Sequence, residues 1–226
     1  MLKIGVFDSG LGGLTVVKSL ISTIKGAKLF YVADTKNAPY GEKTPEQILK
    51  YSLDITKFFI EEHQINALIV ACNTATSAAI QNIRKIYPEL IIIGTEPGIK
   101  PAIEVTCTRK IGVLATPATL KGEKYQQLVS ELSTQHKITL FEQACPGLVE
   151  QIEQGEINTK KTKQMLESWL EPMRAGDVDT IVLGCTHYPL LCEVIEQVMN
   201  RRMTLIHTGN AIAKRLLYLS KSIQHK

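Results

Sequence analysis

This sequence of 226 residues has few aromatic residues and no long apolar run, and these absences argue against nucleic-acid and membrane partners. Aromatic residues make up only 6% and do not alternate with basic residues, so there is no stacking platform for single-stranded nucleic acid. No apolar run approaches the roughly eighteen residues of a membrane span, and the first residues lack the charged and apolar regions of a signal peptide. We expect no nucleic acid and no membrane among its partners, and a cytoplasmic location.

The excess of basic over acidic residues is also small. The net charge is only +4, and the densest basic group, at 160–163, lies among glutamates and glutamines. Such a group is typical of a solvated helix face and not of a phosphate-binding patch. With 44% hydrophobic residues, the chain can nevertheless bury a large core, as one domain or as two small ones.

The spacing of the five cysteines is not typical of disulfide bonds or of a metal site. Their number is odd, their spacing is irregular and no C-x-x-C pair is present, which argues against a disulfide framework and against a redox motif. Cys185 and His187 lie close together in the sequence, but a zinc site commonly takes four ligands. We therefore expect no metal site.

Short apolar runs alternate with longer segments of helical spacing along the whole chain. The strand-length runs lie at 3–7, 29–33, 67–71, 90–94, 110–115, 138–141, 180–184 and 204–207. The helical segments lie at 14–25, 45–64, 75–87, 120–134, 159–173, 189–199 and 211–220. Most strands lack polar alternation, which is typical of parallel strands buried on both faces. The pattern predicts an α/β protein with doubly wound, mainly parallel open sheets, and a (β/α)8 barrel is the competing arrangement.

A weak internal repeat points to two pseudo-symmetric halves. KIGVFDSGLGGLTV begins at Lys3 and KIGVLATPATLKGE at Lys110, while an apolar run ends on a cysteine at both Cys72 and Cys185. In open α/β sheets, ligands bind beyond the carboxyl ends of the strands. Two halves that face each other would bring the cysteines together, so we expect the active site in the cleft between them.

The expected domain boundaries follow from these halves. We predict a first α/β domain over 1–96, with 208–226 returning to it, and a second over 97–207. The stretch GTEPGIKPA, which begins at Gly94, is rich in glycine and proline and is the expected hinge.

The two strand-end cysteines are the sharpest candidates for chemistry. A lone cysteine after an apolar run is usually a small core residue. Here hydrogen-bonding side chains follow at once, namely Asn73, Thr74 and Thr76 after Cys72, and Thr186 and His187 after Cys185. Two such sites suggest proton transfer on the two faces of one carbon centre, with one cysteine arriving as thiol and the other as thiolate.

Both thiols need local help, because an unperturbed cysteine has a pKa near 8.5 and is only a few per cent thiolate at neutral pH. Asp8 is the candidate partner for Cys72, and His187 with Glu153 are the candidates for Cys185. A carbanionic transition state also needs preorganised hydrogen-bond donors. The available donors are Asn73, Thr74, Thr186 and the amides of the glycine loop after Asp8.

Two loops offer sites for anionic groups of a ligand. Asp8–Thr15, DSGLGGLT, follows a strand and opens a helix, and its glycines let the backbone approach a ligand closely. It lacks dinucleotide and P-loop spacing, so a carboxylate is favoured over a nucleotide; the alternative is a tight turn in which Asp8 caps the helix. The stretch NAPYGEK at Asn37 carries a phenol and an open glycine amide, either of which can donate to a second anionic group.

The other cysteines and histidines carry no such pattern. We expect Cys107, Cys145 and Cys192 to serve packing. The histidines without a constellation around them are His63, His136 and His225.

Taken together, five motifs resemble those of the glutamate racemases, cofactor-independent enzymes of bacterial cell-wall synthesis. The motifs are FDSGLGGLTV, NAPYGEKT, ACNTATS, IGVLATPATL and GCTHYPLL, in this order from the first residues to about Leu191. Such a series is highly specific for the racemase superfamily. The resemblance implies two α/β domains with the active site between them, no cofactor, and interconversion of L- and D-glutamate by two thiols, supplying D-glutamate for peptidoglycan.

The resemblance also implies roles for single residues. Cys72 would work on D-glutamate and Cys185 on L-glutamate. The assisting acid/base groups would be Asp8, His187 and Glu153, and Glu150 competes with Glu153. The positions that match substrate-binding residues are Ser9, Pro39, Tyr40, Gly41, Asn73, Thr74, Thr76, Thr119 and Thr186. Of these, Ser9, Tyr40 and Gly41 match residues that hold the side-chain carboxylate, and Asn73, Thr74 and Thr186 match residues that hold the α-carboxylate and amine. D- or L-glutamate is the expected partner, and a homodimer is the assembly we allow for.

Two departures and three rivals stand beside this interpretation. The chain is shorter than most members of the family, and His207 and Thr208 stand where the family usually has an aspartate and a small residue. The nearest rival is a superfamily relative acting on aspartate, a hydantoin or another dicarboxylate such as maleate. A non-catalytic protein that uses the thiols for metal binding or redox sensing is the rival from another class. A pyridoxal enzyme is disfavoured.

Overall fold

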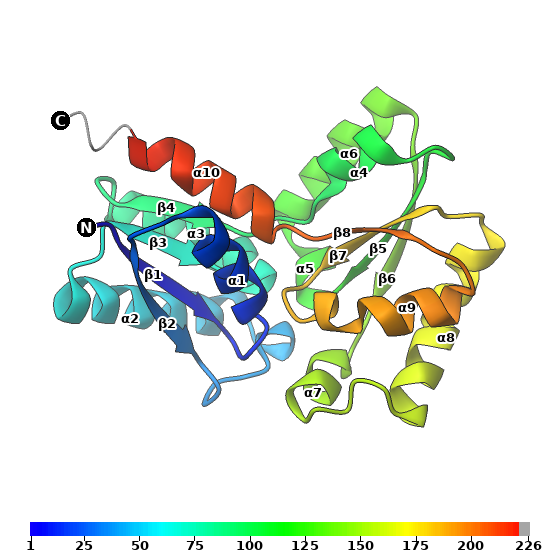
Figure 1. Cartoon of the computed structure of the whole chain (residues 1–226), viewed down its shortest axis with the longest axis horizontal. Coiled ribbons are helices and arrows are strands. Elements are labelled where there is room, and N and C mark those ends of the chain that lie inside the picture. The colour runs from blue at the N-terminus through cyan, green and yellow to red at the C-terminus, as the bar shows by residue number, and fades with distance from the viewer. Residues whose placement is uncertain (222–226) are drawn as a thin grey trace. The chain divides into compact units, whose positions relative to one another are not determined.

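The computed structural model describes residues 1–221 and divides the chain into two compact units (Figure 1). Unit 1 comprises Met1–Glu96 and the segment from Thr208 onwards, and unit 2 comprises Pro97–His207. The chain therefore crosses between the units twice. Residues 222–226, which include His225 and the end of the predicted first domain, lie outside the described residues.

Unit 1 is built on a four-stranded parallel sheet in the order β2-β1-β3-β4. Its strands are β1 (Lys3–Asp8), β2 (Lys28–Ala33), β3 (Ala67–Val70) and β4 (Ile91–Gly94). Its helices are α1 (Leu14–Thr23), α2 (Pro45–His63), α3 (Asn73–Ile86) and α10 (Gly209–Lys221), with a 3-10 turn, η1, at Tyr40–Glu42. In Figure 1, α10, in red, returns from the end of the chain to lie beside α1, in blue.

Side-chain alternation along the central strands explains why helices cover both faces of this sheet. Ile4 and Val6 of β1 pack in one apolar cluster with side chains of α1 and α10, whereas Phe7 packs in a second cluster with α2 and α3. Successive strand residues point to opposite faces, so an apolar run without polar alternation needs a cover on each side. The amphipathic faces of the four helices supply these covers.

Unit 2 repeats the same topology in the order β6-β5-β7-β8. Its strands are β5 (Lys110–Ala115), β6 (Thr139–Ala144), β7 (Thr180–Gly184) and β8 (Thr204–Ile206). Its helices are α4 (Ile99–Val105), α5 (Pro117–Lys121), α6 (Glu123–His136), α7 (Leu148–Glu153), α8 (Lys160–Ala175) and α9 (Cys192–Met199), with a 3-10 turn, η2, at Tyr188–Leu191.

The predicted fold class is confirmed by these two sheets. Each unit has parallel strands alternating with helices, and replacing β1, β2, β3 and β4 by β5, β6, β7 and β8 converts one strand order into the other. The competing (β/α)8 barrel is wrong, because the strands form two open sheets of four instead of one closed ring. Cys72 lies two residues beyond the end of β3, and Cys185 directly follows the equivalent strand, β7.

Three short helices depart from the sequence-based expectation. The predicted hinge stretch from Gly94 does contain the change of unit after Glu96, but its second half belongs to α4. The helices α5 and α7 were not expected, since each is too short to show apolar periodicity. Their local signals are a Thr116 cap with a proline in the first turn for α5, and a left-handed Gly147 for α7.

Within residues 1–221, no helix combines the length and the apolar character needed to cross a bilayer.

The packing expectation for Cys107 is wrong, because this residue is exposed in the turn before β5. Cys145 is buried and Cys192 is half-buried.

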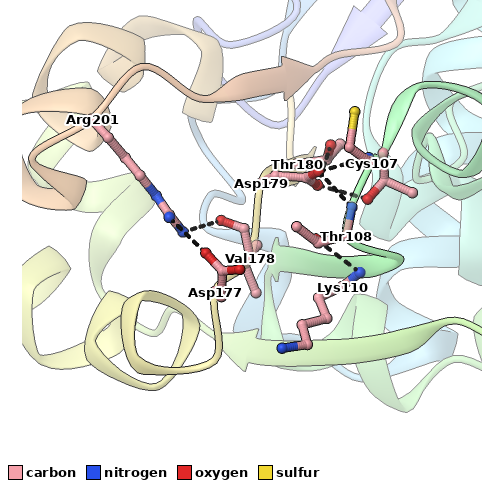
Figure 2. Close-up of polar contacts among 9 residues, drawn as sticks. Cys107, Thr108, Lys110, Asp177, Val178, Asp179, Thr180 and Arg201 are labelled. Atoms are coloured by element: carbon pink, nitrogen blue, oxygen red, sulfur yellow. Dashed lines mark hydrogen bonds and ion pairs between the residues drawn. The ribbon is translucent and has the colours of Figure 1, made fainter.

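The turn before β5, which contains Cys107, is held by the carboxylate of Asp179, the residue before β7 (Figure 2). Its oxygens accept hydrogen bonds from the hydroxyls of Thr106 at 2.6 Å and Thr180 at 2.9 Å, and from the amides of Cys107 at 2.7 Å and Thr108 at 2.9 Å. Partial burial acts to raise the pKa of this carboxyl, but the hydrogen bonds outweigh it and lower the pKa of Asp179 to about 2. One charge thus joins the end of α4 to the start of β7.

We expect Asp179→Asn to lower the free energy of unfolding by about 1–2 kcal/mol at neutral pH, because a neutral amide replaces a charged acceptor. The folded pKa is depressed, so the contribution is complete above the unfolded pKa of about 4 and is lost as the pH falls through about 2. The difference between variant and native protein should therefore fall to about half by pH 3. Urea unfolding at pH 7, 4 and 3 measures it.

Asp177→Asn is the matched control, since Asp177 lies two residues before Asp179, with a side chain 63% exposed and an ion pair to Arg201 (Figure 2). It should cost less than about 1 kcal/mol at any of these pH values. A cost for Asp179→Asn that stays constant down to pH 3 would contradict the assignment.

Candidate active site

In unit 1, the candidate thiol lies at the start of a helix. Cys72 is the N-cap of α3, and its Sγ accepts the amide hydrogen of Ala75 at 3.5 Å. Only 5% of the residue is exposed. Helix N-termini favour negative charge, so the local backbone stabilises an anionic sulfur at this position.

Asp8 ends the neighbouring strand. The amide of Ala71 donates to the carbonyl of Phe7 at 2.8 Å, which places Asp8 and Cys72 at adjacent strand ends. The Asp8 carboxylate is fully buried, and its Oδ2 accepts from the amides of Gly10 at 3.3 Å and Gly13 at 3.0 Å. The turn-stabilising alternative for Asp8 is thus observed, and its role toward Cys72 stays a prediction.

The glycine loop after Asp8 is shaped by close approach. A Cβ on Gly13 would lie 2.7 Å from Cβ of Asp8 and 2.8 Å from the hydroxyl of Tyr31. Only glycine fits there without a shift of its neighbours. Ser9, in the same loop, is 6% exposed.

The first turn of α3 carries the polar residues that follow Cys72. Asn73 and Thr74 are buried, and Nδ2 of Asn73 has no hydrogen-bond partner within the described part of the chain. A buried amide without a partner is costly, which is what a ligand-binding donor looks like before its ligand arrives. Thr76 differs, because its hydroxyl donates to the carbonyl of Val70 at 3.2 Å and accepts from the amide of Thr95 at 2.9 Å. Its contacts are those of a residue that ties β3 to the end of β4.

The loop that carries Pro39, Tyr40 and Gly41 contains the turn η1. The phenol of Tyr40 is buried and donates its hydrogen to Oδ2 of Asp34 at 2.6 Å. Burial, and then this hydrogen bond, raise the pKa of Tyr40 far above its usual value, so the proton stays on the phenol. In this structure the phenol hydrogen is therefore used within the protein, which favours the glycine amide as the donor to an anionic ligand, and the role of Tyr40 in ligand binding stays a prediction.

In unit 2, the second thiol begins a chain of polar contacts. Sγ of Cys185 lies 3.7 Å from Nδ1 of His187, and Nε2 of His187 lies 2.5 Å from Oε1 of Glu153. The His187 side chain is 1% exposed and that of Glu153 26%. Because the carboxylate accepts a hydrogen from Nε2, a neutral His187 presents the lone pair of Nδ1 to the thiol. The imidazole is thus oriented to take the thiol proton.

The two candidate glutamates of α7 differ in their contacts, and which of them assists Cys185 stays a prediction. Glu153 pairs with His187, while Glu150 lies one turn earlier in the helix. The charge of Glu150 acts on another group, since it adds to the burial that raises the pKa of Tyr188. Within unit 2, Glu153 is thus in hydrogen-bond contact with His187, the residue that faces the sulfur of Cys185.

Thr119 and Thr186 complete the same edge of this sheet. Thr186 follows Cys185 and is 5% exposed. Thr119 lies in α5, where its amide donates to Oγ1 of Thr116 at 3.2 Å and the two hydroxyls lie 2.9 Å apart. Both predicted residues therefore lie just beyond the carboxyl ends of β5 and β7.

Sequence reasoning missed two buried neighbours of Cys185. Burial, with a contribution from the charge of Cys185, raises the pKa of Cys145 to about 12, and the phenol of Tyr188 lowers it slightly. Burial likewise raises the pKa of Tyr188. Because both pKa values are raised, both groups are neutral at physiological pH and add no charge near Cys185. The signal that could have found Cys145 is its place directly after β6, which pairs with β5.

Each unit therefore presents a buried thiol just beyond a central strand, with acid/base groups and hydrogen-bond donors from its own elements. Among the described residues, no group of three or more His, Cys, Asp or Glu side chains could hold a metal ion. These parts can move protons. They define an α/β protein with two equivalent thiol sites, one in each unit.

The comparison with protein families agrees with this class: the model for the Asp/Glu/Hydantoin racemases matches residues 4–216, so the chain belongs to this family. The resemblance to glutamate racemases is confirmed by individual relatives. The glutamate racemase of Sulfurovum sp. (strain NBC37-1) is 71% identical over 220 residues, which cover 97% of this chain and 83% of that protein.

Two solved structures show the same fold. Glutamate racemase of Escherichia coli, in complex with L-glutamate and the activator UDP-MurNAc-Ala, has 31% identity and a TM-score of 0.87, covering 96% of this chain and 82% of that one. The enzyme of Francisella tularensis, in complex with D-glutamate, has 29% identity and a TM-score of 0.84, covering 99% of this chain and 82% of that one.

The contact of Glu153 with His187 makes a prediction about thiol reactivity that does not depend on any substrate. Glu153→Gln should slow alkylation of Cys185 by iodoacetamide about tenfold, because a neutral amide stabilises the imidazolium less and fixes the tautomer less firmly. Mass spectrometry of the peptide that contains Cys185, after timed labelling, measures the rate, with the exposed Cys107 as internal reference.

Glu150→Gln is the matched control in the same helix and should leave the rate within about twofold, since the hydrogen bond to His187 comes from Glu153. Equal slowing by the two variants would show that the general charge of α7, and not the contact, controls the thiol.

Proposed function

We propose that this protein interconverts L- and D-glutamate without a cofactor, by proton transfer at the α-carbon through Cys72 and Cys185. The observation that carries the proposal is the equivalence of the two thiols. Cys72 lies just beyond β3 and Cys185 just beyond β7, the equivalent strand of the other unit, and each thiol has polar neighbours from its own unit. The names of the relatives support glutamate as the substrate, and two of the similar structures contain L-glutamate or D-glutamate.

The proposed reaction from L-glutamate starts with both cysteines as thiols. His187 first takes the proton of Cys185, in keeping with its Nδ1 facing the sulfur and its Nε2 bound to Glu153. Cys185 is then a thiolate, and the proton on His187 returns to solvent between turnovers. The thiolate then removes the α-hydrogen, and the electron pair of that bond stays on the carbanion. Cys72 gives its proton to the opposite face. One carbon–hydrogen bond is broken and one is made, so D-glutamate leaves with Cys185 protonated and Cys72 as thiolate.

Donors around the α-carbon must stabilise the carbanion, since an α-hydrogen of an amino acid is a very weak acid. We assign this role to the buried amide of Asn73, to Thr74 and to Thr186. The unpaired Nδ2 of Asn73 supports the assignment, because a ligand carboxylate would satisfy it. Asp8 is proposed to exchange the proton of Cys72 between turnovers.

The distal carboxylate of glutamate is assigned to Ser9 and to the backbone of Tyr40 and Gly41. The phenol of Tyr40 contributes no donor, because its hydrogen goes to Asp34. We also propose that the product supplies peptidoglycan from the cytoplasm, where thiols stay reduced. The activator in the Escherichia coli structure, a nucleotide-linked muramic acid derivative, supports this role for that relative. A homodimer stays a prediction for sedimentation to check.

The test is α-deuterium exchange and racemisation in heavy water, without added cofactor. We expect the native protein to exchange and racemise both enantiomers. Cys72→Ala and Cys185→Ala should each lose racemisation by at least about 10³-fold, because one face of the carbon then has no proton donor or acceptor. The remaining thiol should still exchange one enantiomer without inversion, L-glutamate in Cys72→Ala and D-glutamate in Cys185→Ala.

Cys107→Ala is the matched control, since this cysteine is exposed and lies outside both thiol sites. It should retain native rates. If the native protein exchanges neither enantiomer, the glutamate assignment is wrong. A panel of aspartate, hydantoins and maleate would then identify the substrate of this family member.

A further inference from the structure

Asp34 connects two parts of unit 1 that the proposed function uses. It directly follows β2, and its amide donates to the carbonyl of Asp8 at 2.9 Å. Its carboxylate accepts the phenol hydrogen of Tyr40 at 2.6 Å. Nδ2 of Asn37 lies 3.0 Å from each carboxylate oxygen. One residue thus links the end of β1 to the loop that carries Tyr40 and Gly41.

This contact is strong by its chemistry. A short hydrogen bond from a hydroxyl to a carboxylate is about twice as strong as one between neutral groups. Tyr40 is 1% exposed, so its phenol loses a strong partner in a mostly buried position when the carboxylate is removed. The ring itself packs in the apolar cluster between the sheet, α2 and α3, and therefore the whole Tyr40 side chain is fixed at both ends.

The direction of the hydrogen bond settles what Tyr40 can offer a ligand. With its hydrogen on Asp34, the phenol oxygen has only lone pairs left, and lone pairs do not attract a carboxylate. A negatively charged ligand group at this loop must then be held by backbone amides, whose positions depend on where Tyr40 is anchored. The side chain acts on the loop by holding it, and Asp34 holds the side chain.

We propose that Asp34 is a positioning residue for the distal-carboxylate site, acting through the Tyr40 phenol to fix the Tyr40–Gly41 backbone. This inference rests on the proposed function, which it extends from the thiols to substrate selection. Asn37 donates its amide hydrogens to the same carboxylate and carries no charge. It therefore fixes the orientation of the Asp34 carboxylate without neutralising its charge.

The experiment measures KM and kcat for L-glutamate in the full-length protein. A group that binds a remote part of the substrate equally in ground and transition states changes KM and leaves kcat. Asp34→Ala should raise KM about tenfold or more, with kcat within about twofold. Asp34→Asn should raise it less, because the amide oxygen can still accept the phenol hydrogen once Asn37 turns its own amide.

A double-mutant cycle separates action through Tyr40 from any other effect of Asp34. If Asp34 works through the phenol, then Asp34→Ala, Tyr40→Phe and the double variant should show about the same rise in KM, since each removes the same hydrogen bond. Additive rises would instead mean that the phenol and the carboxylate act separately, and would overturn the proposal.

Matched controls remove the same chemical groups elsewhere in unit 1. Asp54→Ala removes a carboxylate whose side chain is 68% exposed, and Tyr218→Phe removes a phenol from a residue that is 67% exposed. Both should keep native KM and kcat. Thermal unfolding of every variant reports the folded fraction, and Asn37→Ala is the milder variant to use if Asp34→Ala fails to fold.

The outcomes are distinct. A KM rise with native kcat and coupled Asp34 and Tyr40 effects supports the proposal, whereas native KM in Asp34→Ala, or a fall of kcat in proportion to lost folded protein, overturns it. If the native protein fails to racemise glutamate, the proposed function fails. Binding of D-glutamate by calorimetry then replaces KM in the same cycle, and an absence of binding to the native protein overturns this inference as well.

Discussion

Parallel pairing of the central strands is the constraint on which the rest of each unit depends, β1 with β3 in unit 1 and β5 with β7 in unit 2. Parallel strands end at the same edge of the sheet, so the residues that follow them are brought together however far apart they lie in the sequence. Asp8 and Cys72 become neighbours in this way in unit 1. Thr119 and Cys185 reach the same edge of unit 2 by the same rule.

Burial at these edges gives the polar groups their properties. A buried polar group is costly unless it is bonded, and three buried groups at these edges are bonded within their own unit. Asp8 is satisfied by the glycine loop, Tyr40 by Asp34, and His187 by Glu153. These bonds also orient the groups that they satisfy. The bond to Glu153 leaves Nδ1 of His187 facing the sulfur, and the bond to Asp34 takes the phenol hydrogen of Tyr40. Asn73 is one of four described residues with a buried side-chain atom that has no partner, and it is the one that directly follows Cys72, where a ligand is proposed to bind.

Much of this could be predicted from the sequence, and the failures have physical causes. Long apolar runs fixed the strands, because a run without polar alternation has few other ways to be buried, and strand-end cysteines followed by hydroxyls marked the two sites. The helices α5 and α7 escaped because so few turns cannot show a period. Cys107 was expected to pack, yet it lies exposed in a turn closed by Asp179, a residue 72 positions away. The Tyr40 phenol was expected to serve a ligand, and a carboxylate six positions earlier takes its hydrogen instead.

By itself the sequence determined the α/β class, the repeat of one unit in another, and the residues at the strand ends, since all of these follow from local apolar patterning and short motifs. Only the tertiary structure decided how those residues are paired. It selected Glu153 over Glu150 as the partner of His187, turned the hydrogen of Tyr40 toward Asp34, and surrounded Cys185 with the neutral Cys145 and Tyr188. The reason is physical: hydrogen-bond direction and desolvation depend on the atoms that a fold brings within a few ångströms, and sequence spacing carries no record of those distances.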